Sequence, residues 1–329
     1  MGKNNEYKCK RLYAKYVDKG YVLQKRLHTF DVKKSKIFHI EIDQKEIYPN
    51  ITREIIVSVE SDTPLDNLFD ILDKTEKLLM LLEGRFIRLE FIKFYDSNKT
   101  NSEELDLLAE NLLHRRLNYY SSAVFCKSPI NNLIKFESVL STQMFKKWED
   151  LLNELNLSYQ LFLYLLSDNK MTIDINCAFL IGMSESFIEL LHQKKEFLEL
   201  NPGKTGCTLK KCLIGLITKY GIEIFKNELE ELPKMKENNF YQIFVNTRNN
   251  IMHTKRNSKE PYLNGPQCLL YTQKFILLYR KILFVFLEID NDQYTNSLER
   301  SLIYINSRKY DKQSNKTILD EFIYNLTKQ

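Results

Sequence analysis

The chain has 329 residues, of which 43% are hydrophobic and 28% charged, and its formal net charge is +5. These values are typical of a soluble globular protein long enough for two domains, and they exclude a disordered or low-complexity chain. With only 9 glycines and 7 prolines, a loop-rich all-β architecture is disfavoured, and the mild positive charge permits a nucleic-acid partner without requiring one.

Cysteine usage and hydropathy indicate a cytoplasmic protein. None of the six cysteines has CxxC spacing, and no histidine follows the one close pair, Cys207 and Cys212, at zinc-finger spacing. We therefore expect reduced thiols, no metal and no other cofactor. The N-terminus lacks the apolar core of a secretory signal. The most apolar stretch, Phe275–Ile289, is interrupted by Arg280 and Lys281 and is too short to span a bilayer, so no membrane partner is expected.

The first third of the chain mixes strand and helix patterns. Helical leucine spacing predicts a helix over Thr63–Gly84, with Thr63 as cap, Pro64 in the first position and Gly84 as the stop. Asp96–Glu104 is polar and is expected to be a loop. Alternation and β-branched content predict strands at Phe38–Asp43, Arg53–Ser61 and Phe86–Tyr95. Residues 1–135 are therefore predicted to form an α+β domain, an antiparallel sheet with a covering helix.

The strand pattern ends near Pro129, and residues 136–329 are predicted to form an all-α bundle. The boundary is placed within Cys126–Leu140. Helices are predicted at Thr142–Leu155, Ser158–Leu166, Ile173–Leu200, Leu209–Tyr220, Ile222–Leu232, Asn239–His253, Pro266–Ile289, Thr295–Ser307 and Thr317–Thr327.

The helix Asn239–His253 has an unusual polar face. On a helical wheel one stripe is expected to be buried, formed by Phe240, Phe244, Thr247 and Ile251. The opposite stripe carries amides and an imidazole where a solvated face normally has Lys and Glu: Gln242, Asn246, Asn249 and His253. Arg248 lies off that stripe, beside Val245 and Met252. The wheel leaves open whether Arg248 reaches the same site through its long side chain or belongs to a site shared with a partner subunit.

Within NTRNNIMH, the spacing Arg248-Asn249-x-x-x-His253 resembles the R-N-x-x-x-H signature of HEPN domains, and the phrase is most similar to the Apea-like HEPN group. That group places an α+β domain before a HEPN helical bundle, which is the order predicted above. Trp148 falls where such proteins often keep an aromatic residue at the start of the bundle.

The resemblance implies metal-independent RNA cleavage at a composite site built by two protomers of a homodimer. His253 would be the general acid/base, since an imidazole ionises near neutral pH. Arg248 would hold the scissile phosphate and Asn249 would orient it or the histidine. The resemblance also implies an acidic support for the arginine, for which Glu185 matches best and Glu189 is the alternative.

Two further sets of residues are assigned around this motif. Asn246 is counted with Glu185 as a supporting residue. Lys255, Arg256 and Lys259, just beyond the helix, are expected to attract backbone phosphates of RNA.

Simpler interpretations stand beside these assignments. His253 could be a residue that favours a helix C-terminus, the basic residues a solvated loop, and Glu185 one half of a structural ion pair. At the level of function, the first hypothesis is an endoribonuclease, a toxin-like effector of anti-phage defence, whose N-terminal domain responds to a phage-derived or cellular trigger. The alternative is a catalytically silent HEPN module that binds RNA, a nucleotide or a protein partner.

Overall fold

The structure, a computed structural model, describes residues 8–19, 24–47, 50–84, 89–95, 102–120, 132–166, 171–200, 207–235, 239–253, 260–311 and 314–328. The chain divides into two compact units, Met1–Asn153 with Leu166–Asn169 and Glu154–Leu165 with Lys170–Gln329. The division falls inside a helix. It concerns compactness alone, and the domain boundary predicted at 135/136 stays a prediction.

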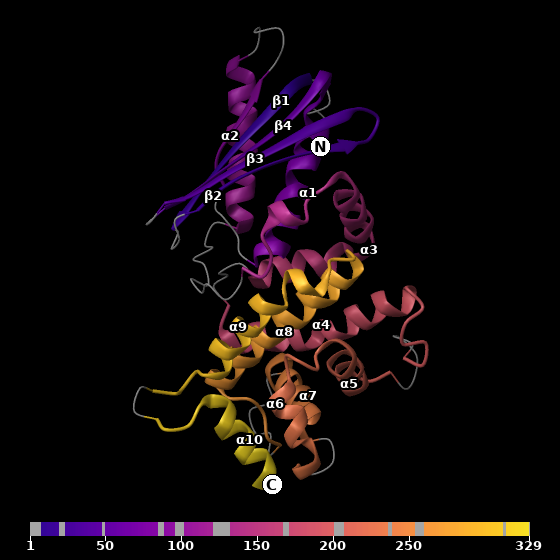
Figure 1. Cartoon of the computed structure of the whole chain (residues 1–329), viewed down its shortest axis with the longest axis vertical. Helices are drawn as coiled ribbons and strands as arrows, with labels where there is room; N and C mark the ends of the chain where they lie inside the picture. The colour runs from indigo at the N-terminus through magenta and orange to yellow at the C-terminus, as the bar shows by residue number, and fades with distance from the viewer. Residues whose placement is uncertain are drawn as a thin grey trace. The chain divides into compact units, whose positions relative to one another are not determined.

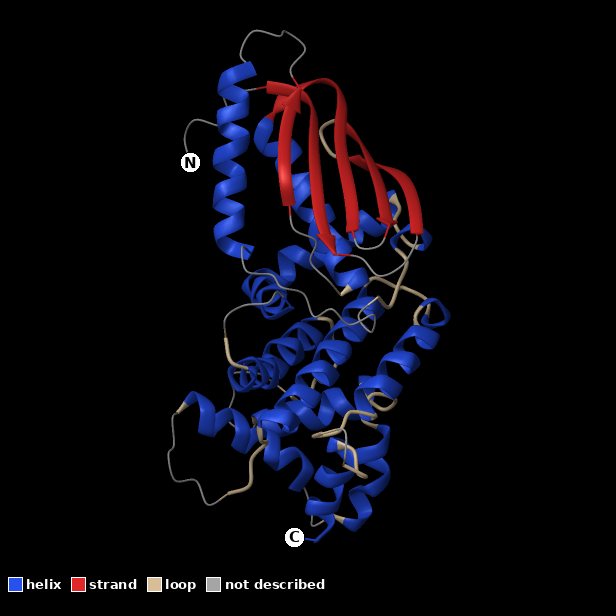
Figure 2. Ribbon diagram, turned by 90° about the vertical axis from the view of Figure 1, so that its left-hand side faces the viewer, coloured by secondary structure: helices blue, strands red, loops and turns tan. Residues whose placement is uncertain are grey.

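The first unit contains a five-stranded antiparallel sheet with strand order β2-β3-β4-β1-β5 (Figures 1 and 2). The strands are β1 (Lys8–Lys19), β2 (Gln24–Lys33), β3 (Ile37–Ile47), β4 (Asn50–Pro64) and β5 (Leu89–Tyr95). The sequence interpretation located β3, β4 and β5 but missed β1 and β2. The buried face of β1 is formed by Cys9, Leu12, Ala14 and Tyr16. These side chains differ in size and polarity and stand among charged residues, so the alternation of buried and exposed positions is not visible in the sequence.

Two helices complete this unit, α1 (Leu65–Glu83) and α2 (Ser102–Tyr120). α1 packs its leucine face against β4 and β1, so the sheet-plus-helix fold class is confirmed. Gly84 ends α1 in the left-handed conformation at φ 63°, as predicted. Thr63, however, is a residue of β4, and Pro64 is the N-cap residue without a side-chain cap hydrogen bond. α2 was missed, because its polar first turn falls in the predicted loop Asp96–Glu104.

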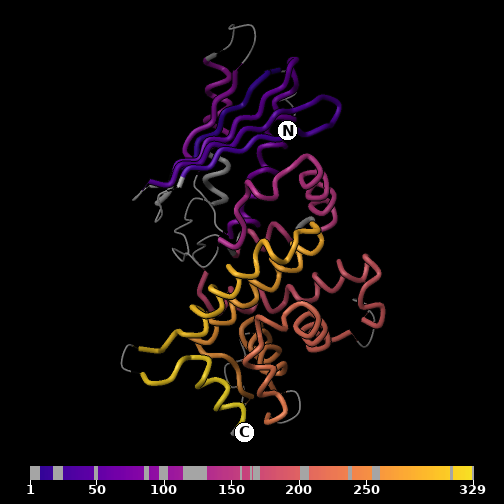
Figure 3. The backbone as a smooth tube through the Cα atoms, in the orientation of Figure 1, coloured from indigo at the N-terminus to yellow at the C-terminus, as the bar shows by residue number. Residues whose placement is uncertain are grey.

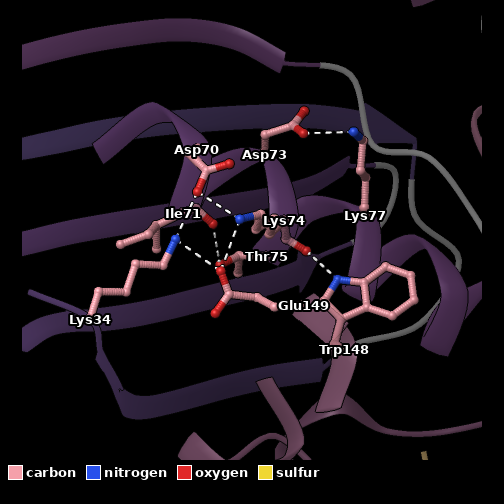
Figure 4. A network of polar contacts seen from close by, with 9 residues as sticks. All are labelled: Lys34, Asp70, Ile71, Asp73, Lys74, Thr75, Lys77, Trp148 and Glu149. Atoms are coloured by element: carbon pink, nitrogen blue, oxygen red, sulfur yellow. Dashed lines mark hydrogen bonds and ion pairs between the residues drawn. The ribbon is translucent and has the colours of Figure 1, made fainter. Parts of the chain in front are cut away.

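A polar cluster holds the β2–β3 turn and the start of α3 (Thr142–Leu166) against α1 (Figure 4). Lys34 and Lys74 both form ion pairs with Asp70 and Glu149, at distances between 2.7 and 2.9 Å. The buried indole of Trp148 donates to the Lys74 carbonyl at 2.8 Å. Trp148 therefore packs against α1, and its expected place at the start of the bundle stays a prediction.

The second unit is helical, as predicted for the bundle. Besides Glu154–Leu165 of α3 it contains α4 (Ile173–Gln193), α5 (Leu209–Tyr220), α6 (Lys226–Glu231), α7 (Asn239–Met252), α8 (Gly265–Phe286), α9 (Thr295–Asn306) and α10 (Ile318–Lys328). Short 3-10 turns lie at Leu232–Lys234 and Asn291–Gln293, and another, Phe136–Ser138, lies in the first unit. The two helices predicted between Thr142 and Leu166 are one continuous helix. The helix predicted over Ile173–Leu200 ends at Gln193 and continues as turns with positive φ at Lys195 and Phe197.

α8 is the central helix of this unit. It packs against α4, and α9 returns along it, as the tube in Figure 3 shows. Asn264 and Gln267 close a capping box at its start, each side chain accepting from the other's backbone N–H at 3.0 Å. Inside the unit, Lys274 of α8 forms a 2.6 Å ion pair with Glu228 of α6, and both side chains are fully buried.

Candidate functional site

The motif helix α7 is held in the unit by an aromatic face. It packs against α4 and α5. The centroid of its Phe244 ring lies 4.9 Å from the ring centroid of Tyr271 and 5.4 Å from that of Phe275, both on α8. Phe240, Phe244 and Thr247 are fully buried, as the helical wheel predicted, and Ile251 is half-buried. This packing fixes the rotation of α7 about its axis, and it therefore fixes where the polar residues point.

Arg248 lies half-buried along α4. An ideal Cβ at Gly182 of α4 would be 4.0 Å from its Nε, an ordinary contact distance, so the side chain crosses α4 at that residue. Its Nη1 donates to Oδ1 of Asn249 at 3.1 Å. Within the described part of the chain, no carboxylate lies within 4.0 Å of the guanidinium. The remaining guanidinium N–H groups are thus available to an anion.

The two candidates for the acidic support, Glu185 and Glu189, both lie on α4, the helix that Arg248 crosses. Glu185 and Glu189 of α4 are both exposed. Glu185 is three residues from Gly182, where Arg248 crosses, yet no ion pair joins it to Arg248 among the described side chains. The assignment of Glu185 as a support for Arg248 stays a prediction.

His253 lies just beyond the last helical residue and is exposed. Its backbone N–H donates to the carbonyl of Asn249 at 3.0 Å, which is the last helical hydrogen bond of α7. The side chain of Asn249 therefore contacts Arg248, whereas its link to His253 is through the backbone alone. The last turns of α7 thus carry an amide bonded to a guanidinium, followed by an exposed imidazole.

The helical wheel placed the polar stripe opposite the buried face of α7, but only part of this stripe lies on the surface. Asn246 is 6% exposed: its Nδ2 donates to the Pro261 carbonyl at 3.1 Å, and its Oδ1 accepts from Gln242 at 2.9 Å. We call Pro261–Leu263 the strap, because the chain returns there along α7. Asn246 thus holds the strap against α7.

Thr247, assigned to the core stripe, also holds the strap. Its hydroxyl accepts from the Leu263 N–H at 2.9 Å and donates to the Ile243 carbonyl at 2.7 Å. The strap lies just after the residues predicted to bind RNA. Lys255, Arg256 and Lys259 lie in 254–259, outside the described residues.

Sequence reasoning missed Gly182, Thr247 and Asn250 as residues of the site. Asn250 has a buried Nδ2 for which the described residues provide no hydrogen-bond partner, and it follows Asn249 in the motif. The doubled asparagine was the only signal in the sequence, since no pattern distinguishes an amide that faces the site from one that faces a neighbouring helix.

Two general properties of the described residues bear on function. No group of three or more His, Cys, Asp or Glu side chains among them is arranged to hold a metal ion. Across the same residues, none of the helices combines the length and apolar character needed to cross a membrane.

Residues 179–293 match the family model described as Apea-like HEPN, and this segment runs from α4 to the turn before α9. It includes Arg248, Asn249 and His253. The chain thus carries a HEPN domain of the Apea-like family, a domain generally associated with ribonuclease or nucleotide-related functions.

Neither the curated proteins nor the solved structures contain a significant match to this chain.

Proposed function

We propose that this protein is a metal-independent endoribonuclease whose site lies at the end of α7. The observation that carries the proposal is that Arg248, hydrogen-bonded to Asn249, and the exposed His253 lie along the last turns of one helix. An ion pair with a carboxylate of the same chain would neutralise the charge of an arginine. The guanidinium of Arg248 has no such partner among the described residues. It is therefore suited to a phosphate.

The roles follow from the chemistry of the three side chains. His253 takes the proton of a ribose 2′-hydroxyl, or gives a proton to the departing 5′-oxygen. The 2′-oxygen attacks phosphorus and the bond from phosphorus to the 5′-oxygen breaks. Arg248 stabilises the charge that grows on the phosphate oxygens, and Asn249 fixes the position of the guanidinium. The products are a 2′,3′-cyclic phosphate and a free 5′-hydroxyl.

The proposed assembly is a homodimer with a composite site. One chain supplies one arginine and one histidine, and a two-fold contact between two α7 ends would bring both motifs together. Met252, beside His253, is 43% exposed and offers apolar surface there. Its apolar neighbour α8 is also proposed to lie at or near that interface.

The decisive experiment incubates the purified full chain with total RNA, with and without EDTA, and reads the end groups after end-labelling. Cleavage should persist in EDTA, spare DNA of the same sequence and leave 5′-hydroxyl ends. His253→Ala should lower the rate about 10²–10⁴-fold, the usual contribution of a positioned acid or base. His39→Ala is the matched control, because His39 is an exposed histidine of β3 paired with Asp31.

A requirement for Mg²⁺, 5′-phosphate products or full activity of His253→Ala would overturn the assignment.

The proposed assembly is tested by sedimentation of the purified full chain, which should give the mass of a dimer. A strictly monomeric chain that still cuts RNA would refute the composite site.

A second candidate function is a catalytically silent HEPN module that binds RNA, a nucleotide or a protein. The same half-buried guanidinium of Arg248, hydrogen-bonded to Asn249, would hold a phosphate whether or not the phosphate is then cleaved. The EDTA experiment separates the two, since a silent module would bind RNA without shortening it.

The proposed biological role is that of a cytoplasmic, toxin-like effector of anti-phage defence, restrained or triggered through the first unit. Overexpression in a bacterium should then arrest growth, and His253→Ala should relieve the arrest. Arrest that survives this change would show that the toxicity does not come from the α7 site.

A further inference from the structure

Two thiols meet at the start of α5. Sγ of Cys207 lies 3.5 Å from Sγ of Cys212. Cys212 is 1% exposed, whereas Cys207 is only half-buried. The pair therefore has one sulfur that small solutes can reach and one that is enclosed by the protein.

The start of the helix brings the two sulfurs together. Thr208 is the N-cap residue of α5, and its side chain accepts from the N–H of Lys211 at 3.4 Å. Cys207 then precedes the cap, and Cys212 is the fourth residue of the helix. Side chains at these two positions commonly pack against each other across a helix start, where apolar residues form a hydrophobic staple. Here both members of the staple are cysteines.

From this geometry we propose that Cys207 and Cys212 form a modification site, at which an oxidant of the peroxide class closes an intramolecular disulfide. The sulfurs already point toward each other, and bond formation requires them to approach to about 2 Å. Side-chain rotation provides such a movement without separating the cap from the helix, because the cap hydrogen bond does not involve either sulfur.

The reaction proceeds in two balanced steps. Hydrogen peroxide reacts at the accessible Cys207: its O–O bond breaks, the sulfur gains one OH to become a sulfenic acid, and the other oxygen leaves with the thiol proton as water. The sulfur of Cys212 then attacks the sulfur of Cys207. The S–O bond breaks, the OH departs with the proton of Cys212 as water, and the S–S bond remains. Two thiols lose two electrons, and one peroxide becomes two waters.

The different burial of the two thiols indicates which one reacts first. Burial and the hydrogen bond with Cys207 raise the pKa of the Cys212 thiol, so this sulfur stays protonated and shielded until a sulfenic acid forms beside it. Cys207 is the residue that peroxide reaches first. The disulfide would tie Cys207 to α5, a helix that packs against α4 and α7.

The position of the tryptic sites makes the test direct. Lys210 and Lys211 lie between the two cysteines, so trypsin separates them into peptides 205–210 and 212–219. The full-length protein is treated with hydrogen peroxide, blocked with an alkylating agent, unfolded and digested. We expect the two peptides to be recovered mainly as one disulfide-linked species, lighter than their sum by two hydrogen atoms.

Variants test the order of the steps. Cys212→Ser removes the second thiol, so sulfenic acid trapped at Cys207 by dimedone should rise at least about tenfold over wild type. Cys9→Ser, which removes a buried thiol of β1, is the matched control and should leave the trapping unchanged. The wild-type digest decides the matter even if Cys212→Ser folds poorly.

Recovery of Cys207 from the wild type mainly as thiol, as sulfinic or sulfonic acid, or in a disulfide between two chains would overturn the proposal. None of these measurements depends on RNA cleavage, so the inference stands or falls separately from the proposed function.

Discussion

Replacing Thr247 by valine should destabilise the second unit, although the two side chains have nearly the same shape. Thr247 is fully buried, and its hydroxyl accepts from the Leu263 N–H at 2.9 Å. Valine cannot accept that bond, so a buried backbone donor of the strap loses its partner. An unsatisfied buried donor costs roughly 1–3 kcal/mol. The hydroxyl's second bond, to the Ile243 carbonyl, is less important because that carbonyl is also part of the helical ladder of α7.

We therefore expect Thr247→Val to lower the free energy of unfolding by about 2 kcal/mol, measured by urea titration followed by circular dichroism. The corresponding drop in Tm is roughly 4–8 °C for a domain of about 150–250 residues. Thr247→Ser retains the hydroxyl and should recover most of this loss.

Thr218→Val is the matched control. The Thr218 hydroxyl donates to the carbonyl four residues earlier, at 2.7 Å, as that of Thr247 does, but it lies exposed on α5. Thr218→Val should therefore change the free energy of unfolding by no more than about 0.5 kcal/mol. If Thr247→Val costs no more than Thr218→Val, the hydrogen bond to the strap does not stabilise the unit, and the reasoning is refuted.

Three further changes test other parts of the molecule. Arg248→Lys keeps the charge but should lose most RNA cleavage, because an ammonium does not reproduce a two-point grip on phosphate; near-normal cleavage would show that Arg248 acts through charge alone. Lys274→Met should cost about 3–5 kcal/mol in a urea titration because it leaves Glu228 buried and unpaired, and adding Glu228→Gln should recover part of that loss; equal stability of the single and double variants would contradict this. Burial raises the pKa of Asp70, but hydrogen bonds from its two lysine partners lower it more, so the pKa lies below the usual value of an aspartate. The contribution of Asp70 to stability is therefore present at neutral pH and is lost as the pH falls below about 4. The Tm difference between Asp70→Asn and wild type should accordingly shrink from pH 7 to about pH 3, and a constant difference would refute the linkage.

The sequence determined the type and position of the strongly periodic elements. α7, α8 and α9 end within three residues of their predicted bounds, because a helix that buries one face must repeat apolar residues every three or four positions. β1, β2 and α2 escaped prediction. Charged residues interrupt the alternation of the two strands, and the first turn of α2 is polar, so their apolar faces become visible only against the elements that cover them.

The motif itself was also legible in the sequence, since Arg248, Asn249 and His253 are defined by residue type and spacing. Their surroundings were not. A helical wheel gives the angle at which Asn246 leaves α7, but not that the chain returns 15 residues later and covers it with Pro261. Such contacts depend on residues distant in sequence, because burial is decided by what packs on a surface and not by the surface alone. Only the tertiary structure could turn an apparently solvated amide into a buried support of the strap.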